Sequence, residues 1–318
     1  MAHLRHLPLG YGGEFDLISA ALRQWGQLAS GIGDDCAVLE VPAGMRMVLS
    51  VDTAVEGVHF RRPWLTPEEV GYRAATAALS DIAAMSAEPV GVAIAMTLPD
   101  AWRDNFLSIC DGIGEAARAV GAKIIGGDLT HGTELSLTLT VVGHAALPLS
   151  RGGAQPGDAL WVTGRLGGPL LAIRAWERGD APSSESRARF AHPVARFAEA
   201  RWLAAHGVTA GLDISDGIVA DAGHLAAAGG VQVVVNLDRL PLAPAATVED
   251  AAQSGEEFEL LVTGPASLDA AAFEQAFGIP LTCIGAVAPP VSGEPAVEAL
   301  RQGARVQLPR GHDHFPSA

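Results

Sequence analysis

Lysine is almost absent from this chain of 318 residues, and cysteine is scarce. The single lysine, Lys123, does not stand in a G-x-x-x-x-G-K-[ST] pattern, so the sequence excludes a P-loop. Any phosphate must then be held by arginines, backbone amides or metal ions. The three cysteines are odd in number and widely spaced. They predict a reduced, cytoplasmic protein with neither a disulfide framework nor a cysteine metal site.

Long apolar runs and basic clusters are also missing. The stretch closest to membrane-spanning length, residues 82–99, is interrupted by Glu88 and Pro89, and we expect neither a membrane segment nor a secretion signal. A formal charge of −15 makes nucleic acid an unlikely partner. With 49% hydrophobic and 18% charged residues, the chain has ample core material for two domains. An acidic protein can still bind anions if cations lie between them.

Carboxylates follow apolar runs at several places. Residues 31–39 contain Asp34 and Asp35 before a short apolar run, and residues 48–51 lead directly to Asp52. Both runs predict buried strands. The adjacent carboxylates repel each other, so they are tolerable only if a cation binds them or if they are solvated. From this stretch alone, a metal site and a solvated turn are both compatible with the sequence.

Three further segments repeat this arrangement. Asp81 lies near the end of a helix expected over 66–85, which Thr66, Pro67 and Glu69 begin with a capping box. The alternative for Asp81 is an exposed helix stripe. Asp128 ends a short strand predicted over 123–128, and Asp213 and Asp216 precede a helix over 218–228. No cysteine or histidine cluster accompanies these carboxylates, so hard cations such as Mg²⁺ bound to a polyphosphate are favoured.

The segment 150–158 is rich in glycine and proline and favours a domain boundary near 148–156. Beyond it, residues 164–169 form a glycine-rich turn from strand to helix, which suits either a structural turn or a phosphate site. We expect a polar tail after the strand at 281–287. The histidines of that tail, His312 and His314, are compatible with metal binding but are more typical of an incidental pair.

Taken together, these segments resemble the thiamine-monophosphate kinase family of the aminoimidazole ribonucleotide synthetase-like superfamily. The resemblance covers nearly the whole chain, and each short motif occurs in the family's order. The motifs are Gly13-Glu14-Phe15, Gly31-Ile32-Gly33-Asp34-Asp35-Cys36-Ala37, Asp52-Thr53 with Glu56-Gly57-Val58-His59-Phe60, Leu79-Ser80-Asp81, Gly126-Gly127-Asp128, Arg151 with Pro156-Gly157-Asp158, Val162-Thr163-Gly164, Asp213-Ile214-Ser215-Asp216-Gly217, Gly255-Glu256 with Glu259-Leu260, and Asp313-His314-Phe315.

The resemblance implies ATP-dependent phosphorylation of thiamine phosphate to thiamine diphosphate. It implies a two-domain α/β (α+β) fold, in which residues 1–148 bind metal and ATP and form a β-barrel shared between two subunits of a homodimer, and residues 149–318 form an α/β domain. It also implies roles for individual residues. Magnesium ions would be bound by Asp35, Ser50, Asp52, Asp81, Asp128, Asp213 and Asp216, ATP by Arg151, Ser215 and Gly127, and thiamine phosphate by His59, Glu256 and Phe315.

This chain departs from the family pattern at several positions. Val51 stands where threonine is frequent, and Glu257 and Phe258 replace an aspartate and a tyrosine. His312 stands where an aromatic ring is usual, and Phe315 is the candidate to replace it. The acceptor is a phosphate that is already ionised, so we expect direct in-line transfer without a general base or a covalent residue. The alternatives are a cyclo-ligase or selenophosphate synthetase of the same superfamily, and a non-catalytic acidic protein that binds cations.

Overall fold

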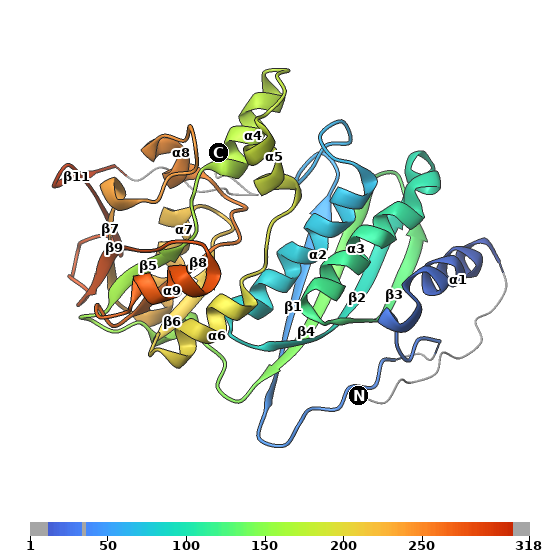
Figure 1. The fold of residues 1–318 in the computed structure, drawn as a ribbon, viewed down its shortest axis with the longest axis horizontal. Coiled ribbons are helices and arrows are strands. Elements are labelled where there is room, and N and C mark those ends of the chain that lie inside the picture. The colour runs from blue at the N-terminus through green and yellow to red at the C-terminus, as the bar shows by residue number, and fades with distance from the viewer. Residues whose placement is uncertain (1–11, 34–35, 308–318) are drawn as a thin grey trace. The chain divides into compact units, whose positions relative to one another are not determined.

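The computed structural model describes residues 12–33 and 36–307. The chain divides into two compact units, Met1–Ile82 with Ala87–Pro148, and Ala83–Ser86 with Leu149–Ala318. Each unit is built on one β-sheet with helices packed against it (Figure 1), which confirms the predicted α/β class. In the described ranges, no helix has both the length and the apolar character needed to cross a membrane.

The N-terminal unit contains a four-stranded sheet in the order β1-β4-β2-β3. Strand β4 pairs antiparallel with β1 and β2, whereas β3 runs parallel to β2. Helices α2 and α3 cover one face of the sheet (Figure 1). The elements are α1 (Gly13–Trp25), β1 (Arg46–Val55), α2 (Pro67–Ala84), β2 (Glu88–Leu98), α3 (Phe106–Val120), β3 (Lys123–His131) and β4 (Ser136–Ala145).

Helix α2 begins as its sequence predicts. The Glu69 carboxylate accepts a hydrogen bond from the Thr66 backbone N–H at 2.8 Å, and the Thr66 hydroxyl accepts one from the Glu69 N–H at 3.3 Å. This reciprocal capping box satisfies two amides that the helix leaves free. Against α3 the contact is very close, because a Cβ on Gly112 would lie 1.8 Å from the carbonyl oxygen of Glu68.

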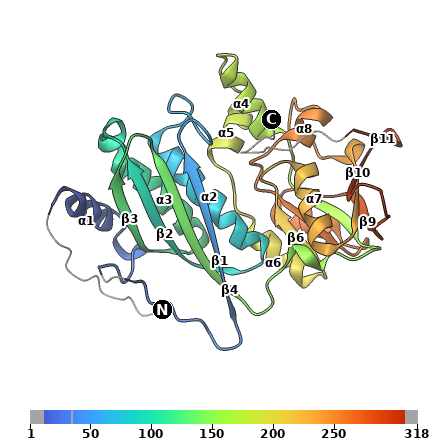
Figure 2. The same cartoon turned by 180° about the vertical axis from the view of Figure 1, so that it is seen from behind.

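On the other face of this sheet, no helix formed by residues 12–33 or 36–148 is seen, as Figure 2 shows from behind. Along β1, side chains alternate between the two faces. Val48 is 8% exposed on the covered face, whereas Leu49 and Val51 are 59% and 55% exposed on the open one. Their register partners in β4, Val142 and Thr140, lie on the same face, where Val142 is buried and Thr140 half-buried. The unit therefore presents apolar side chains on a sheet surface of its own.

The C-terminal unit contains a seven-stranded sheet in the order β11-β10-β7-β9-β5-β8-β6. Its central strands are largely apolar, and Leu160, Val162, Leu261 and Ile284 are wholly buried in one core with helix α7. The strands are β5 (Ala159–Thr163), β6 (Ala210–Asp213), β7 (Gln232–Asn236), β8 (Leu260–Gly264), β9 (Leu281–Ala288), β10 (Val297–Arg301) and β11 (Ala304–Val306). The helices are α4 (Gly168–Glu177), α5 (Ser184–Ala191), α6 (Phe197–Ala205), α7 (Ile218–Gly229), α8 (Val248–Gln253) and α9 (Ala270–Phe277).

The structure corrects three predictions of secondary structure. Residues 36–39 form no strand, and Val38 is exposed, because this apolar run has no neighbouring strand to pair with. The Gly126-Gly127-Asp128 segment lies inside β3 and not at its end. The tail after β9 is not merely polar, since β10 pairs in parallel with β7 and then antiparallel with β11.

Candidate active site

Three predicted metal ligands of the N-terminal unit lie on β1 and α2. The Ser50 hydroxyl donates a hydrogen bond to Asp81 Oδ2 at 2.5 Å, so the strand and the helix present these groups together. Asp52 lies two residues further along β1 and therefore on the same face as Ser50. All three residues are half-buried. Their oxygen atoms form a donor set of the kind that a hard cation prefers.

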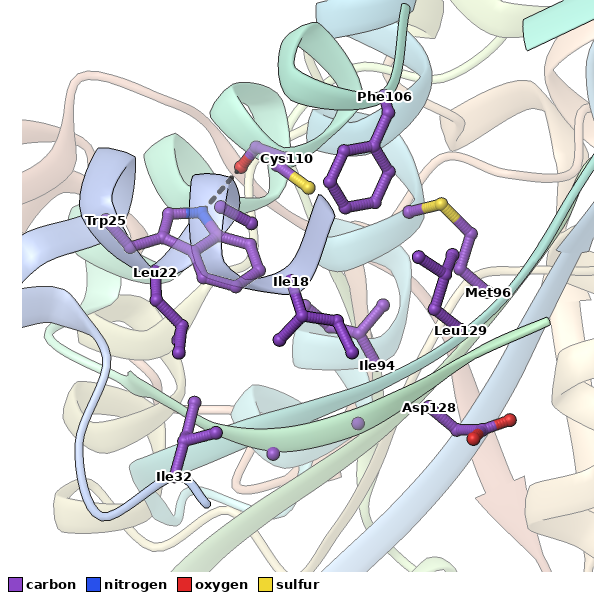
Figure 3. Close-up of a pocket in the computed structure, with 13 residues that line it drawn as sticks. Ile18, Leu22, Trp25, Ile32, Ile94, Met96, Phe106, Cys110, Asp128 and Leu129 are labelled. Carbon is purple, nitrogen blue, oxygen red and sulfur yellow. Dashed lines mark hydrogen bonds between the residues drawn. The ribbon is translucent and has the colours of Figure 1, made fainter. Parts of the chain in front are cut away.

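Asp128 and Gly127 lie on β3, away from that group. Asp128 is in register with Ala95 of β2, which pairs with Thr138 of β4, and is thereby on the open face of the sheet. Figure 3 shows its carboxylate pointing away from a small pocket beneath α1. This pocket is apolar, holds about 70 Å³ and is bordered by Gly127.

His59 lies just beyond β1 and is oriented by the strand that precedes it. Its Nδ1 accepts a hydrogen bond from the backbone N–H of Val55 at 3.1 Å. A neutral ring bonded in this way carries its proton on Nε2. The ring can therefore donate a hydrogen bond from Nε2 to an anionic oxygen such as that of a phosphate.

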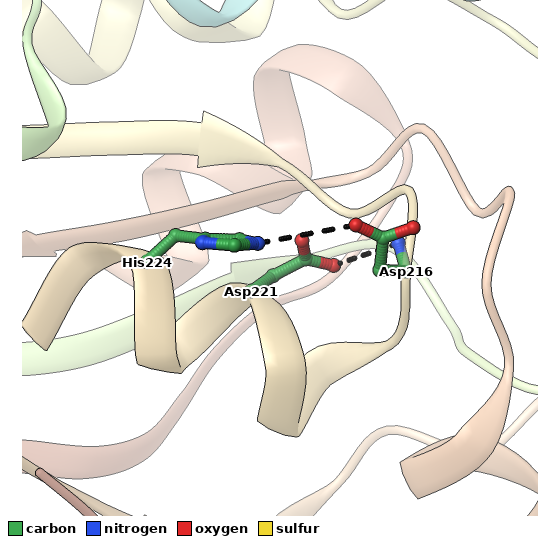
Figure 4. Close-up of side chains that lie close together, drawn as sticks. All are labelled: Asp216, Asp221 and His224. Atoms are coloured by element: carbon green, nitrogen blue, oxygen red, sulfur yellow. Dashed lines mark hydrogen bonds and ion pairs between the residues drawn. The ribbon is translucent and has the colours of Figure 1, made fainter. Parts of the chain in front are cut away.

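In the C-terminal unit, the predicted ligands Asp213 and Asp216 lie where β6 passes into α7. Asp213 is buried at the end of the strand, and Asp216 precedes the first turn of the helix. Within the described residues, one group of three His, Cys, Asp or Glu side chains has ligand atoms within 4.8 Å of one another, namely Asp216, Asp221 and His224 (Figure 4). Neither Asp221 nor His224 was among the predicted ligands. Their spacings of five and eight residues from Asp216 are the signal in the sequence that could have found them.

Asp221 carries the most perturbed carboxyl group of this loop. It is 2% exposed, and its Oδ2 accepts hydrogen bonds from the backbone N–H groups of Asp216 and Gly217, each at 3.1 Å. Burial, followed by repulsion from Asp216 and Asp213, raises the pKa of Asp221 to about 8, against the effect of the two amides. At neutral pH the Asp221 carboxyl group is therefore mostly protonated, and a cation bound beside it would favour its charged form.

Glu256, predicted to bind the acceptor, lies beside this loop. Its backbone N–H donates to the carbonyl oxygen of Ser215 at 2.7 Å, and the N–H of Phe258 donates to that of Ile214 at 2.9 Å. Both Glu256 and Phe258 have a left-handed backbone, with φ of 55° and 51°. This conformation costs a non-glycine residue roughly 1–2 kcal/mol, so the surrounding contacts must hold it.

The glycine-rich turn at 164–169 is a structural turn. The amide of Gly167 donates to Glu257 Oε1 at 2.5 Å, and that of Leu170 donates to the Ser254 hydroxyl at 3.3 Å. A buried carboxylate of the protein thus takes the place that a phosphate would need at the start of α4. Burial raises the pKa of Glu257 to about 7, although Arg189 acts in the opposite direction.

The remaining predicted site residues are Ser215, Arg151, Asp35 and Phe315. Ser215 is half-buried in the loop after β6, and Arg151 is exposed in a short 3-10 turn that follows the capping residue Ser150. Asp35 and Phe315 lie outside the described residues, as do His312 and His314. Their predicted roles stay predictions.

Comparisons with known proteins agree across both units. The family model of the AIR synthase related protein N-terminal domain matches residues 33–145, and that of the C-terminal domain matches residues 155–294. Thiamine-monophosphate kinase of Salmonella typhimurium is 34% identical over 95% of this chain and 98% of that protein.

Two solved structures are also similar to this chain. The crystal structure of thiamine-monophosphate kinase from Stenotrophomonas maltophilia has 31% identity and a TM-score of 0.79, and covers 96% of this chain and 100% of that one. A structure of AaThiL complexed with AMPPCP and TMP has 28% identity and a TM-score of 0.74, and covers 95% of this chain and 97% of that one.

Proposed function

The chain belongs to the AIR synthase related family and, within it, to the thiamine-monophosphate kinases, which phosphorylate thiamine phosphate with ATP, and from this premise we propose how its residues serve that reaction. ATP donates its γ-phosphoryl group to the phosphate of thiamine phosphate, giving thiamine diphosphate and ADP. One observation carries the proposal for the C-terminal unit: the loop of Asp213 and Asp216 is hydrogen-bonded directly to the segment of Glu256. Residues proposed for the metal and for the acceptor therefore lie side by side.

We assign the binding of Mg²⁺ to the oxygen ligands on both units. The assigned residues are Asp35, Ser50, Asp52, Asp81, Asp128, Asp213 and Asp216. The donor set fits a hard cation, because it contains carboxylate and hydroxyl oxygens only. The ligand atoms of Asp216 and Asp221 lie within 4.8 Å of each other, which supports a cation beside Asp216. When bound, Mg²⁺ supplies the positive charge that lets two polyanions approach each other.

The protein's own residues orient the two substrates. His59, whose Nε2 can donate a hydrogen bond to a phosphate oxygen, and Glu256 are the residues assigned to the acceptor. Phe315 is proposed to contact the thiamine, and Arg151, Ser215 and Gly127 to contact ATP. The acceptor phosphate is already ionised, so no residue has to remove a proton. Transfer is therefore in line and direct, without a phosphorylated enzyme.

We further propose that two chains associate through the open face of the N-terminal sheet. Leu49 and Val51 are more than half exposed on that face, and a second copy would cover them. Size-exclusion chromatography with light scattering tests this, and a dimer that becomes monomeric in Leu49→Glu is expected. The three free cysteines, of which Cys36 is exposed, support placing this assembly in the cytoplasm.

The activity itself is tested by ³¹P NMR of the purified protein with ATP, Mg²⁺ and thiamine phosphate. We expect thiamine diphosphate and ADP to appear together and only with Mg²⁺. ADP formed only with another acceptor would favour a sister enzyme of the superfamily. Metal uptake without nucleotide binding in calorimetry would favour a non-catalytic cation-binding protein.

A further inference from the structure

The segment Gly255–Glu259 has a backbone that its own residues do not favour. Glu256 and Phe258 have φ values of 55° and 51°, and Glu257 lies between them. The alternation sends neighbouring side chains to different surroundings, so that Glu257 and Phe258 are buried while Glu256 is half-buried. A Cβ on Gly255 would lie 2.5 Å from the carbonyl oxygen of Ser215. The segment therefore lies close to residues 213–217 with Asp221, which we call the metal loop. Something outside the segment must stabilise this conformation.

Arg189 of helix α5 contacts the segment from the side. Its Nη2 donates to the carbonyl oxygen of Glu257 at 3.1 Å and lies 3.3 Å from Glu257 Oε2 and 3.0 Å from Glu259 Oε1. One guanidinium thus bridges the main chain and two carboxylates of the segment. The Glu257 side chain is wholly buried and that of Arg189 is 22% exposed, so water screens these contacts weakly.

A second group fixes the end of the segment where it enters β8. Glu259 accepts from Arg196 Nε at 2.9 Å and from the Thr163 hydroxyl at 2.7 Å, and its Oε1 lies 2.5 Å from Arg196 Nη2. This end would stay in place without Arg189. The residues freed by the loss of Arg189 would be Glu256 and Glu257, which precede it.

The metal loop has support of its own. Asp221 accepts from the amides of Asp216 and Gly217, and β6 pairs antiparallel with β8. Losing Arg189 would therefore release the acceptor side of the site and leave the carboxylates of Asp213 and Asp216 where they are.

We propose that Arg189 is a positioning residue that sets the backbone of Glu256 for binding of the acceptor phosphoester, and this inference rests on the proposed function. Arg189 does not itself touch the substrate. Because it acts on one substrate only, its loss separates the two Michaelis constants. A residue needed merely for folding would lower the active fraction and leave both constants unchanged.

The test compares Arg189→Met and Arg189→Lys with the unchanged protein. Arg189→Met is expected to raise KM for thiamine phosphate at least tenfold, with KM for ATP changed less than threefold. Arg189→Lys keeps the charge but not the fork of donors, and a smaller rise is expected. Arg305→Met is the matched control. Like Arg189, Arg305 pairs with two carboxylates, those of Glu294 and Glu298, but neither of them belongs to the segment Gly255–Glu259. Both constants should stay within twofold in that variant.

Hydrogen exchange supplies a measurement that does not depend on activity. In Arg189→Met the amides of Glu256 and Phe258 should exchange at least tenfold faster, and those of Asp216 and Gly217 should not. Equal increases in both KM values, or unchanged exchange at Glu256 and Phe258, would overturn the inference. If the unchanged protein makes no thiamine diphosphate, the proposed function fails, and the exchange experiment still decides whether Arg189 holds the segment.

Discussion

Two groups of carboxylates in the C-terminal unit are joined by backbone hydrogen bonds, yet arginines pair with the carboxylates of one group, whereas the carboxylates of the other lie beside one another. Glu259 lies between Arg196 and Arg189, which outweigh its burial and hold its pKa below the usual range. Asp221 faces Asp216 and Asp213, and burial and repulsion raise its pKa to about 8. The arginines neutralise the charge of the first group within the protein, and we propose that a cation does so for the second. We call them the paired group (Glu257, Glu259, Arg189, Arg196) and the metal loop (residues 213–217 with Asp221).

The largest effect is expected from removing charge in the metal loop. Asp216→Asn should lower kcat at least 1,000-fold at saturating Mg²⁺, because a carboxamide is a poor ligand for a hard cation. Asp52→Asn should do the same on the N-terminal unit. The circular dichroism spectra and melting temperatures should stay close to those of the unchanged protein. Asp180→Asn, in an exposed ion pair with Arg178, is the control. Near-normal turnover in both variants would refute the metal assignment.

The paired group should respond in stability. Arg196→Met leaves Glu259 buried with one of its two arginines, and breaking a buried pair from one side costs about 3–5 kcal/mol. Urea denaturation should show a lower midpoint with an unchanged m value. Folded Arg196→Met protein should still bind Mg²⁺ with normal affinity, measured by calorimetry. A loss of Mg²⁺ affinity with normal stability would erase the distinction between the two groups.

Within the paired group, Glu257 should make the stability of the folded protein depend on pH. Its pKa is about 7 in the folded protein against a usual 4.5, so the folded chain binds the proton more tightly than the unfolded chain. The resulting stability is complete below pH 4.5 and is lost as the pH rises through 7. A pKa that differs by one between the folded and the unfolded chain corresponds to about 1.4 kcal/mol, so the rise from 4.5 to about 7 corresponds to a loss of stability of about 3 kcal/mol.

The measurement is urea denaturation at pH 5, 6, 7 and 8 on the unchanged protein and on Glu257→Gln. The fall in stability between pH 5 and 8 should be smaller in Glu257→Gln, which has no proton to lose at this position. The same slope in both proteins would contradict the raised pKa of Glu257.

The sequence predicted features whose causes are local. The capping box of Thr66 and Glu69 lies within one turn of helix, and the helix predicted over 218–228 is present as α7. It failed at residues 36–39, because an apolar run becomes a strand only where a neighbour pairs with it.

In the candidate site, too, features with local causes were predicted and features that depend on distant segments were not. Asp213 and Asp216 were predicted as metal ligands from their spacing and their family pattern, whereas Asp221 beside Asp216 was not. The sequence did not reveal that the Glu257 carboxylate occupies the glycine-rich turn, because Gly167 and Glu257 are 90 residues apart in the chain. Helix α5, which carries Arg189, was missed as well, since its first turn is serine-rich and depends on the Ser183 cap.

The smallest effect is expected from substituting His224. This substitution tests whether the histidine is a metal ligand or only a neighbour of Asp216. Nε2 of His224 lies 3.9 Å from Asp216 Oδ2, and the histidine side chain is 52% exposed. An exposed contact of this kind contributes about 0–1 kcal/mol, so His224→Asn should change the Mg²⁺ concentration for half-maximal activity less than threefold. If the imidazole were a ligand, the variant would also change the preference for Mn²⁺ over Mg²⁺, since nitrogen donors favour the softer ion. Measuring activity with both ions therefore distinguishes a neighbour of Asp216 from a ligand. If the Mg²⁺ requirement shifts slightly and the preference for Mn²⁺ over Mg²⁺ stays the same, the proposed ligands of the metal loop are its oxygen donors alone.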